Sequence, residues 1–511
     1  METSSSKAKT TLDRRTFVGG IAAASAFTIL PRHVLGGSGR IAPSDRLNVA
    51  QIGCGTQGLR QATVGYVQRE DVQITCVCDP NTDSSNYVDW SRYGNRNDVR
   101  RLLDDPTWGE SDTGIRSGRE VARQVIETYY GKKKPSGSYT GVRSYADFRE
   151  LFEKESDLDA AIIITPDHTH ATISLAAMGK GVAPICHKPV SNVLHEVRRT
   201  IEAARASSVT SHLLAWGDDA DFYRLEAMLK GGVIGTVREV HNWTSRPFWP
   251  QGWLDYPAEQ PPVPAGFDWD LWLGPEPHRP YHPTYTFALY RGWYAYGGGC
   301  FADMGNYSLW NIYRMLDLGA PTSVEARANT VAYLDEFNVS RFKLSEVAYP
   351  VAGTLHFTHA PKEGRPGIDL YWYEGGIKPQ TPPELRETGE SLEGEGMMFV
   401  GDAGKILCHF HGNGPRVLGT STAANAPAIP APEVEIVDGA DEWIRAYKNG
   451  GRSRGAFENV EALAEATALG GVAFRVAGKR LLWDSANLRI TNDEDANRFV
   501  RRTYREGWEI A

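Results

Sequence analysis

The 511-residue sequence has little of the positive charge that a nucleic-acid-binding surface needs. Its 55 Lys and Arg residues stand against 63 Asp and Glu, which gives a net charge of −8. This balance argues against a protein that binds nucleic acid through bulk charge. The 52 glycines and 29 prolines follow no strict period, which excludes collagen-like and low-complexity chains.

Cysteines are also few, and none of the six forms a CxxC pair. Cys76 and Cys78 alternate with other residues along an apolar run, so both thiols would lie on one face of a strand. We interpret the cysteines as small buried hydrophobic residues and expect no disulfide framework. The length and the 41% of hydrophobic residues predict about two to three domains with buried cores.

No run of 18 uninterrupted apolar residues occurs, so no membrane-spanning helix is expected. Arg14 and Arg15 precede a Gly- and Ala-rich apolar stretch at 19–30. As a helix this stretch would rise about 18 Å, too little to cross roughly 30 Å of hydrocarbon. We therefore predict that residues 1–45 are a twin-arginine export signal and tail, with a periplasmic mature protein outside the membrane. A disordered basic tail is the alternative.

A glycine motif follows the first predicted strand. Residues 47–52 form an apolar run, the motif Gly-Cys-Gly-Thr-Gln-Gly comes next, and 59–69 are compatible with a helix. The first glycine permits a tight turn, the second lets the backbone approach a pyrophosphate, and the third lets the helix pack on the strand. The phosphates would then lie at the helix N-terminus. The expected cofactor contacts are Gly53, Gly55, Thr56, Gln57 and Gly58.

A second predicted strand, 72–78, ends in Asp79, which lies 21 residues after Gly58. At this spacing a carboxylate hydrogen-bonds the ribose diol of a dinucleotide. Because an unpaired carboxylate repels a 2′-phosphate, we expect NAD rather than NADP as the cofactor. A chance strand–helix–strand unit with these glycines is the alternative.

A buried strand is also predicted at 158–165, and polar residues follow it. The carboxyl end of a strand is where α/β sheets bind ligands, so we expect Thr165, Pro166, His168 and His170 to contact the cofactor. Two histidines at this spacing could suggest a metal ion. No third ligand is nearby, however, so no metal is expected.

From residue 47 to the C-terminus the sequence resembles the Gfo/Idh/MocA family of NAD(P)-dependent sugar oxidoreductases. The resemblance rests on the glycine motif, on 165–170, on Cys-His-Lys-Pro at 186–189, and on Gly-Gly-Cys-Phe-Ala-Asp-Met-Gly-Asn-Tyr at 298–307. The family usually has Glu where His187 stands. Many members have His where Tyr307 stands, and a Tyr there is similar to the glucose–fructose oxidoreductase branch.

The resemblance implies an α/β protein with an N-terminal Rossmann dinucleotide-binding domain at 46–190. It implies that 191–511 form an α+β domain, with an open, mostly antiparallel sheet that serves substrate binding and oligomerisation. A homodimer or homotetramer is expected. Further strands are predicted at 323–331, 352–359, 369–373, 397–400 and 405–408, helices that cover this sheet at 442–448 and 460–477, and a solvated loop at 378–395.

The resemblance also nominates the catalytic residues. Lys188 would hold the substrate hydroxyl beside the nicotinamide, and both His187 and Lys188 would contact the cofactor. Tyr307 would relay the proton from the opposite wall, and Asp303, one helical turn earlier, would orient the substrate. An exposed Lys188 and an N-cap role for Asp303 are the structural alternatives.

Aromatic residues are concentrated between 243 and 296, where six of the 14 tryptophans lie. Aromatic faces with polar edges suit sugar rings, although packing of a Pro-rich loop accounts for part of the cluster. We expect Trp293 and Tyr296, nearest to the segment that carries Asp303, to bind the substrate together with Lys188, Asp303 and Tyr307.

The leading hypothesis is an exported NAD-dependent oxidoreductase that acts on a sugar, a sugar derivative or a glycoside. Free NAD is scarce outside the cytoplasm, so the cofactor would be retained between turnovers. One alternative is an NAD-dependent glycoside lyase or hydrolase that works through a transient 3-keto intermediate. Another is a non-catalytic sugar-binding protein.

Overall fold

The computed structural model describes residues 45–89, 91–214, 218–419 and 435–510. The predicted export signal lies outside these residues. The chain divides into two units, Met1–Arg46 and Leu47–Ala511, and the second unit carries all the elements below. Within the described residues, no helix has both the length and the apolar character needed to span a membrane.

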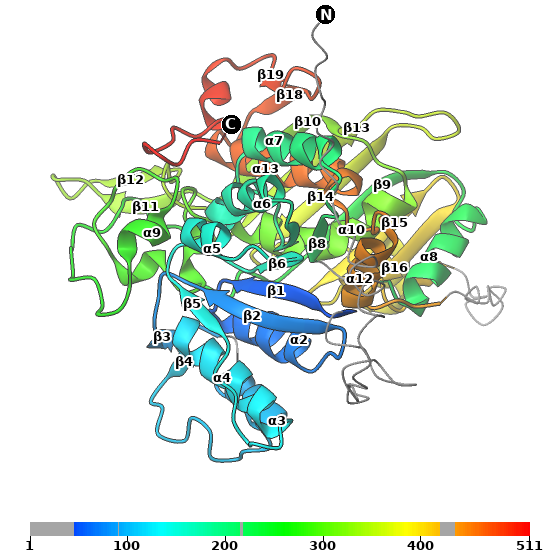
Figure 1. Cartoon of the computed structure of the whole chain (residues 1–511). Coiled ribbons are helices and arrows are strands. Elements are labelled where there is room, and N and C mark those ends of the chain that lie inside the picture. Colours follow the sequence, from blue (N-terminus) through cyan, green and yellow to red (C-terminus); the bar gives the residue numbers. More distant parts are fainter. Residues whose placement is uncertain (1–44, 90, 215–217, 420–434, 511) are drawn as a thin grey trace, which may run out of the picture. The chain divides into compact units, whose positions relative to one another are not determined.

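The first sheet has six strands in the order β5-β2-β1-β6-β7-β8, and all neighbouring strands are parallel (Figure 1). Apolar runs form its central strands because both faces of the sheet are covered. The Rossmann-type fold predicted from the sequence is confirmed. The strands are β1 (Leu47–Ile52), β2 (Val72–Cys78), β5 (Arg143–Tyr145), β6 (Ala160–Ile163), β7 (Ala183–His187) and β8 (His212–Leu214).

Helices cover both faces of this sheet. Leu59 and Val121 belong to one apolar cluster, and Ile173 and Val197 belong to another. The sheet continues past residue 190, where we expected the first domain to end, because one more crossover helix leads into β8. The covering elements are the π-helical segment η2 (Gly58–Val64), α2 (Gly65–Val67), α4 (Arg119–Lys132), α5 (Phe148–Lys154), α6 (His170–Gly179) and α7 (Leu194–Ala206).

The second sheet has nine strands in the order β17-β16-β15-β9-β14-β13-β10-β18-β19. Only the β14–β9 pair is parallel, which confirms the mostly antiparallel sheet. Its strands are β9 (Val237–Trp243), β10 (Pro321–Ala328), β13 (Gly353–His359), β14 (Ile368–Glu374), β15 (Gly396–Gly401), β16 (Gly404–Cys408), β17 (Arg416–Leu418), β18 (Arg480–Asp484) and β19 (Arg489–Ile490).

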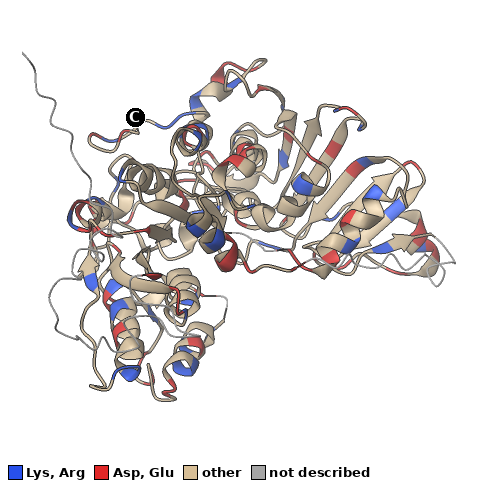
Figure 2. Cartoon of the chain, turned by 45° about the vertical axis from the view of Figure 1, so that its right-hand side comes forward, with Lys and Arg blue, Asp and Glu red and all other residues tan. Residues whose placement is uncertain are grey.

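One face of the second sheet is packed and the other is more open. Side chains of β13 and β14 alternate strictly between buried and half-buried positions. The helices α10 (Asn306–Met315) and α13 (Glu461–Arg475) contribute to the apolar cluster on the packed face. Figure 2 shows Lys and Arg interspersed with Asp and Glu along the described elements.

Two predictions for the second half are wrong in part. Residues 378–395 were expected to be a solvated loop, but they contain α11 (Pro383–Thr388), because Leu385 and Leu392 are buried among the charged residues. The predicted helix at 442–448 is α12 (Gly439–Asn449), but it packs on the first sheet rather than the second. Its Trp443 donates a hydrogen bond of 3.0 Å to the hydroxyl of Tyr66.

Smaller elements complete the described chain. The polar segment before α4 forms a two-stranded sheet and one helix. A separate hairpin lies between β10 and β13. These elements are β3 (Ser84–Tyr87), α3 (Gly94–Leu103), β4 (Ile115–Ser117), α8 (Ala220–Lys230), α9 (Trp269–Leu273), β11 (Val331–Leu334) and β12 (Ser340–Lys343).

Candidate active site

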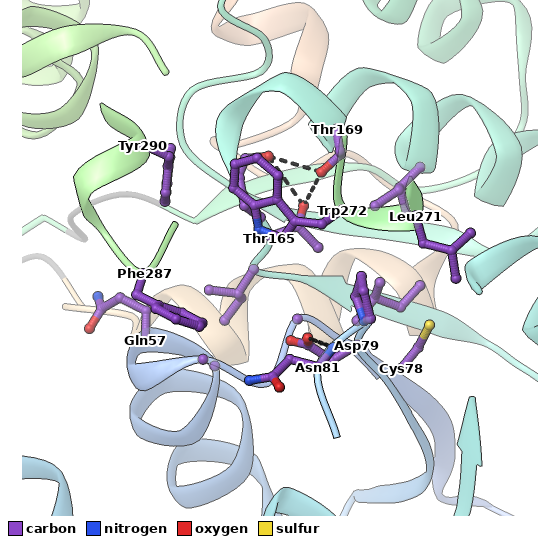
Figure 3. A pocket seen from close by; sticks show the side chains of 18 of the residues that line it. Gln57, Cys78, Asp79, Asn81, Thr165, Thr169, Leu271, Trp272, Phe287 and Tyr290 are labelled. Carbon is purple, nitrogen blue, oxygen red and sulfur yellow. Dashed lines mark hydrogen bonds between the residues drawn. The ribbon is translucent and has the colours of Figure 1, made fainter. Parts of the chain in front are cut away.

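A cavity lies along the carboxyl ends of the strands of the first sheet. Gly53, Asp79, Ala146, Thr165 and His187, which follow or end five of these strands, all line it. The cavity therefore crosses the sheet edge from β5 to β7, where α/β sheets bind their ligands. Figure 3 shows Thr165, Thr169 and Trp272 on one side and Gln57, Asp79 and Asn81 on the other.

The glycine turn has the geometry that a pyrophosphate requires. Gly53 has a φ of +95°, and a Cβ there would lie 2.2 Å from the carbonyl oxygen of Ile164. A Cβ on Gly58 would lie 2.1 Å from the carbonyl oxygen of Gly53, so this glycine permits the close packing of η2. A Cβ on Gly55 would meet only the side chain of Tyr87. Gly55, Thr56 and Gln57 line the cavity at the start of a helix, and the turn therefore fits a dinucleotide.

Asp79 lies at the end of β2 and binds the glycine turn. One carboxylate oxygen accepts the backbone N–H of Cys54 at 2.7 Å, and the other accepts that of Asn81 at 2.8 Å. Burial raises the pKa of Asp79, although these two hydrogen bonds oppose the shift. A carboxylate offers about four lone-pair directions, so it can also accept ribose hydroxyls.

The stretch after β6 divides into residues that line the cavity and residues behind it. Thr165 and Pro166 line the cavity, whereas His168 and His170 are not among the lining residues. The nitrogens of His168 lie 3.2 and 3.0 Å from the carbonyl oxygens of Tyr296 and Trp272. Burial lowers the pKa of His168 to about 3, so this ring is neutral and its single N–H can donate to only one of the two carbonyls.

His170 joins two segments of the site. Its ring nitrogens lie 2.6 Å from the carbonyl oxygen of Pro189 and 2.9 Å from that of Thr165. Burial opposes ionisation of His170, but neighbouring groups, among them Cys186 and Asp167, outweigh it and raise its pKa to about 9. An imidazolium that donates from both nitrogens suits two carbonyl partners. Both histidines therefore shape the wall from behind.

Lys188 directly follows β7 and is only 3% exposed. Its Nζ donates to the backbone carbonyl of Asp303 at 2.6 Å and also to the Asp303 carboxylate. The same nitrogen lies 4.3 Å from the ring centre of Tyr307. The alternative that Lys188 is exposed is therefore wrong. The alternative that Asp303 is an N-cap is also wrong, because its carboxylate forms an ion pair with Lys188.

The local backbone brings these groups together. Asp303 lies in a π-helical segment, η6 (Phe301–Gly305), which leads directly into α10, where Tyr307 lies. Such π turns occur frequently at functional sites. Here both the carbonyl and the carboxylate of Asp303 face the lysine from the first sheet.

Arg291 adds a second positive charge. Its Nε lies 3.2 Å from the Asp303 carboxylate. Burial alone would raise the pKa of Asp303, but Lys188 and Arg291 hold that pKa well below its usual range. The carboxylate is therefore ionised at every pH at which the protein would be assayed.

Tyr307 lies between Lys188 and His187. Its hydroxyl is 3.3 Å from Nε2 of His187. Burial raises the pKa of Tyr307, although Lys188 opposes the shift, and burial also lowers the pKa of His187 well below its usual value. His187 is thus a neutral ring whose Nε2 can accept a hydrogen bond from the Tyr307 hydroxyl. His187 and Arg291, on either side of this cluster, both line the cavity, whereas Lys188, Asp303 and Tyr307 lie directly behind them and are not among the lining residues.

The predicted substrate residues Trp293 and Tyr296 lie in an aromatic core. Both are fully buried, and neither is among the lining residues of the cavity. Trp293 stacks on Trp253 with ring centres 4.3 Å apart, and its Nε1 donates to the carbonyl oxygen of Thr284 at 2.8 Å. Tyr296 packs against the ring of His168. Sugar binding by these two rings would require a rearrangement of this core.

Sequence reasoning missed the residues of the aromatic segment 243–296 that do line the cavity, among them Trp272, Tyr290 and Arg291. It also missed Asp167, which is 2% exposed and accepts the backbone N–H of Gly298 at 2.9 Å and the Tyr290 hydroxyl at 3.3 Å. Asp167 thereby ties the turn after β6 to the segment that precedes η6. Its position directly after Thr165-Pro166 was the one signal in the sequence.

Metal ligands and disulfides do not contribute to this arrangement. In the described part of the chain, no three His, Cys, Asp or Glu side chains converge as a metal site would require. All six cysteines are buried free thiols. The polar groups that the structure gathers beside the cavity are the ammonium of Lys188, the hydroxyl of Tyr307 and the carboxylate of Asp303.

The parallel sheet, its glycine turn and the cavity at the strand ends define a Rossmann-type dinucleotide-binding protein joined to an α+β domain. Residues 116–214 match the model of the oxidoreductase family, NAD-binding Rossmann fold, and 225–349 match that of the oxidoreductase family, C-terminal alpha/beta domain. Both models describe one family. Residues 116–214 and 225–349 thus match the two domains of the Gfo/Idh/MocA oxidoreductase family.

Individual relatives are distant. Inositol 2-dehydrogenase 4 of Saccharopolyspora erythraea is 30% identical over 90 residues, which are 17% of this chain and 26% of the relative. The chain thus spans about a quarter of the length of this curated relative. The WlbA dehydrogenase from Bordetella pertussis, solved with NADH and UDP-GlcNAcA, is 14% identical with a TM-score of 0.49, over 86% of this chain and 99% of its own. The aldose-aldose oxidoreductase from Caulobacter crescentus is 14% identical with a TM-score of 0.47, over 86% of this chain and 100% of its own.

Proposed function

We propose that the chain is an NAD-dependent oxidoreductase that oxidises a hydroxyl-bearing carbon of a sugar, a sugar derivative or a glycoside. The observation that carries this proposal is the buried Lys188–Asp303 pair. The pair lies beside His187 and Arg291, which line the same cavity as the glycine turn. The name of the curated relative, an inositol dehydrogenase, supports a polyhydroxylated ring as the substrate.

NAD, when bound, supplies the hydride acceptor. The glycine turn would hold its pyrophosphate and Asp79 its adenosine ribose, which leaves the His187 end of the cavity for the reacting groups. Lys188 would donate a hydrogen bond from Nζ to the substrate hydroxyl and hold the oxygen in place. Asp303 fixes Nζ through two contacts, so the ammonium needs no reorganisation when the substrate arrives.

The proton of the hydroxyl needs an acceptor as the carbon is oxidised. The Tyr307 hydroxyl can relay this proton: it takes up the proton released near Lys188 as it gives its own to Nε2 of His187, and the His187 ring, whose pKa burial lowers, passes the proton on to water in the cavity that it lines. Arg291 keeps the Asp303 carboxylate ionised, so Asp303 acts by position and charge rather than as a base.

The test of the proposal is release of the cofactor. Denaturation of the purified protein should release NAD, and addition of a suitable sugar to the folded protein should produce the absorbance of NADH. A protein that releases no NAD, and binds none at micromolar concentration, would contradict the proposal. Incubation with glycosides and no added acceptor separates the two chemistries: net bond cleavage supports the lyase or hydrolase alternative, whereas an oxidised product that needs an acceptor supports the oxidoreductase.

We also propose that the protein is exported by the twin-arginine route to the periplasm with its cofactor retained. The paired Arg14 and Arg15 before a short apolar stretch support this location. Replacement of both arginines by Lys should leave unprocessed protein in the cytoplasm. Normal export of that variant would overturn the proposed location.

For the assembly, we propose a homodimer or homotetramer. The half-buried side chains on the open face of β13 and β14 support an interface between copies of the chain. Light scattering of the purified protein tests this proposal, and a monomer at micromolar concentration would contradict it.

A further inference from the structure

The end of the cavity farthest from Lys188 is mostly apolar, and the one carboxylate that follows β5 there, that of Asp147, is paired with Arg149. Strand order places β5 beyond β2 at one edge of the sheet, whereas Lys188 follows β7 on the other side of β1. A dinucleotide with its pyrophosphate on the glycine turn and one ribose at Asp79 must direct its adenine toward β5. The lining residues at this end include Ala146, Phe148, Leu271 and Trp508.

Trp508 comes from the C-terminal tail, far in the sequence from the rest of the dinucleotide site. It is 7% exposed and borders the cavity. The guanidinium of Arg149 lies 4.3 Å from its ring centre, and the ring of Phe148 lies 6.0 Å away. The indole is thus held against the start of α5, the helix that follows the strand at this edge.

The tail is fixed by a buried ionic network rather than lying loosely on the surface. The Arg502 side chain is 4% exposed and forms ion pairs of 2.8 Å with Glu196, in α7, and of 2.7 Å with Glu276. Three residues later, Arg505 pairs with Asp270 and donates its backbone N–H to the carbonyl oxygen of Pro275. Chain ends are ordinarily poorly ordered unless they are anchored, so this anchoring determines where Trp508 lies.

We propose that the C-terminal tail is part of the nucleotide site and that the indole of Trp508, with Phe148 and Leu271, forms the wall that receives the adenine ring. The inference rests on the dinucleotide function proposed above. A flat, weakly polar base suits an apolar slot with an aromatic side, because stacking on an aromatic side chain accepts a base through its face. The tail then contributes affinity at the adenosine end only, far from the reacting groups at Lys188.

The experiment measures the binding of AMP, nicotinamide mononucleotide and NAD by calorimetry to the full chain, after charcoal treatment to strip bound nucleotide. The variants are Trp508→Ala, Trp508→Leu and the control Phe337→Ala, which removes an aromatic residue that is 76% exposed between β11 and β12. The leucine variant keeps an apolar side chain in the packing of the tail if the alanine variant does not fold. Both Trp508 variants should weaken AMP and NAD binding by about 10- to 100-fold, the range expected for the loss of one base–aromatic stack.

Nicotinamide mononucleotide has no adenosine, so its affinity should be unchanged in all variants. Unchanged AMP binding in both Trp508 variants would overturn the proposal. An equal loss of AMP and nicotinamide mononucleotide would also overturn it, because the tail would then support the fold as a whole. A wild-type protein that binds neither NAD nor AMP would contradict the proposed function itself. Normal NAD binding by the wild type, with the same AMP affinity in both Trp508 variants, would contradict only the role of the tail.

Discussion

The ammonium of Lys188 donates to both the backbone carbonyl and the carboxylate of Asp303, a residue 115 positions further along the chain. The first residue follows the parallel sheet and the second lies beside the packed face of the antiparallel sheet. This contact therefore joins the two sheets next to His187 and Arg291, which line the cavity. Because the charge pair is buried, each partner is required to compensate the other.

Replacement of Lys188 by Ala should lower the rate of the chemical step by about 10²- to 10⁴-fold, the usual effect of losing a positioned acid–base group. NAD binding should stay nearly normal, because the glycine turn and Asp79 are unchanged and Asp303 keeps Arg291 as a partner. Single-turnover formation of NADH and calorimetry measure the two effects. Lys180→Ala, at the exposed end of α6, is the control. A fully active Lys188→Ala enzyme would place the chemistry elsewhere.

Tyr307→Phe separates proton transfer from packing, because it removes the hydroxyl near His187 and keeps the ring beneath the Lys188 ammonium. If Tyr307 relays the proton, hydride transfer should slow by about 10²-fold or more and its pH dependence should change. Tyr313→Phe on the same helix is a matched control, because its hydroxyl also faces a histidine, at 3.4 Å from Nε2 of His359. A silent Tyr307→Phe with a damaging Tyr307→Ala would assign Tyr307 to packing alone.

Asp79→Ala should weaken NAD binding by about 1–3 kcal/mol through the loss of charged hydrogen bonds to the ribose. The variant also leaves the backbone N–H groups of Cys54 and Asn81 without their acceptor, so the turn itself should loosen. Calorimetric titration with NAD measures the change. Asp83→Ala, four residues further on and paired with Arg116, should bind NAD as the wild type does. Equal affinity of the Asp79 variant would remove this residue from the site.

Glu374 gives a pH-dependent prediction away from the cavity. Its side chain is fully buried, one oxygen accepts from Nε1 of Trp372 at 2.8 Å, and burial raises its pKa to about 8. The folded state therefore prefers the protonated form, and the wild type should lose stability as the pH rises from about 4.5 through about 8. Glu374→Gln cannot ionise and should avoid this loss.

The measurement is urea denaturation at about pH 5 and about pH 9. We compare the unfolding free energy of Glu374→Gln with that of the wild type at each pH. This difference should shift in favour of the variant by more than about 1 kcal/mol from about pH 5 to about pH 9. Glu239→Gln is the control, because this carboxylate lies on the neighbouring strand β9 and is half-exposed. If the difference in unfolding free energy between Glu374→Gln and the wild type is the same at both pH values, the raised pKa of Glu374 is contradicted.

Local patterns were enough to predict the sheets and the glycine turn. The apolar run at 158–165 is enough by itself to indicate a buried strand. Glycine is required at positions 53 and 58 because a Cβ at either position would clash with a nearby backbone oxygen. The placement of Lys188, Asp303 and Tyr307 in one cluster could be expected because each belongs to a recognisable motif. Their chemical roles stay predictions.

Other features depend on the path of long segments, which the sequence does not encode locally. Tyr290 borders the cavity whereas Trp293, three residues later, lies in the core, because short turns redirect each ring. His168 and His170 follow a strand as expected, yet both rings bind backbone carbonyls. Nothing near Trp508 in the sequence indicates its position at the dinucleotide cavity.

The contact between Trp443 and Tyr66 has a consequence for how the protein is made. The two residues are 377 positions apart, and their rings lie 6.1 Å from each other in the apolar cluster of the first sheet. A ribosome must therefore synthesise most of the chain before the N-terminal half can cover this surface. Nascent chains will present it to chaperones in the meantime, and a gene shortened after β8 will encode an aggregation-prone fragment rather than a free-standing coenzyme-binding module.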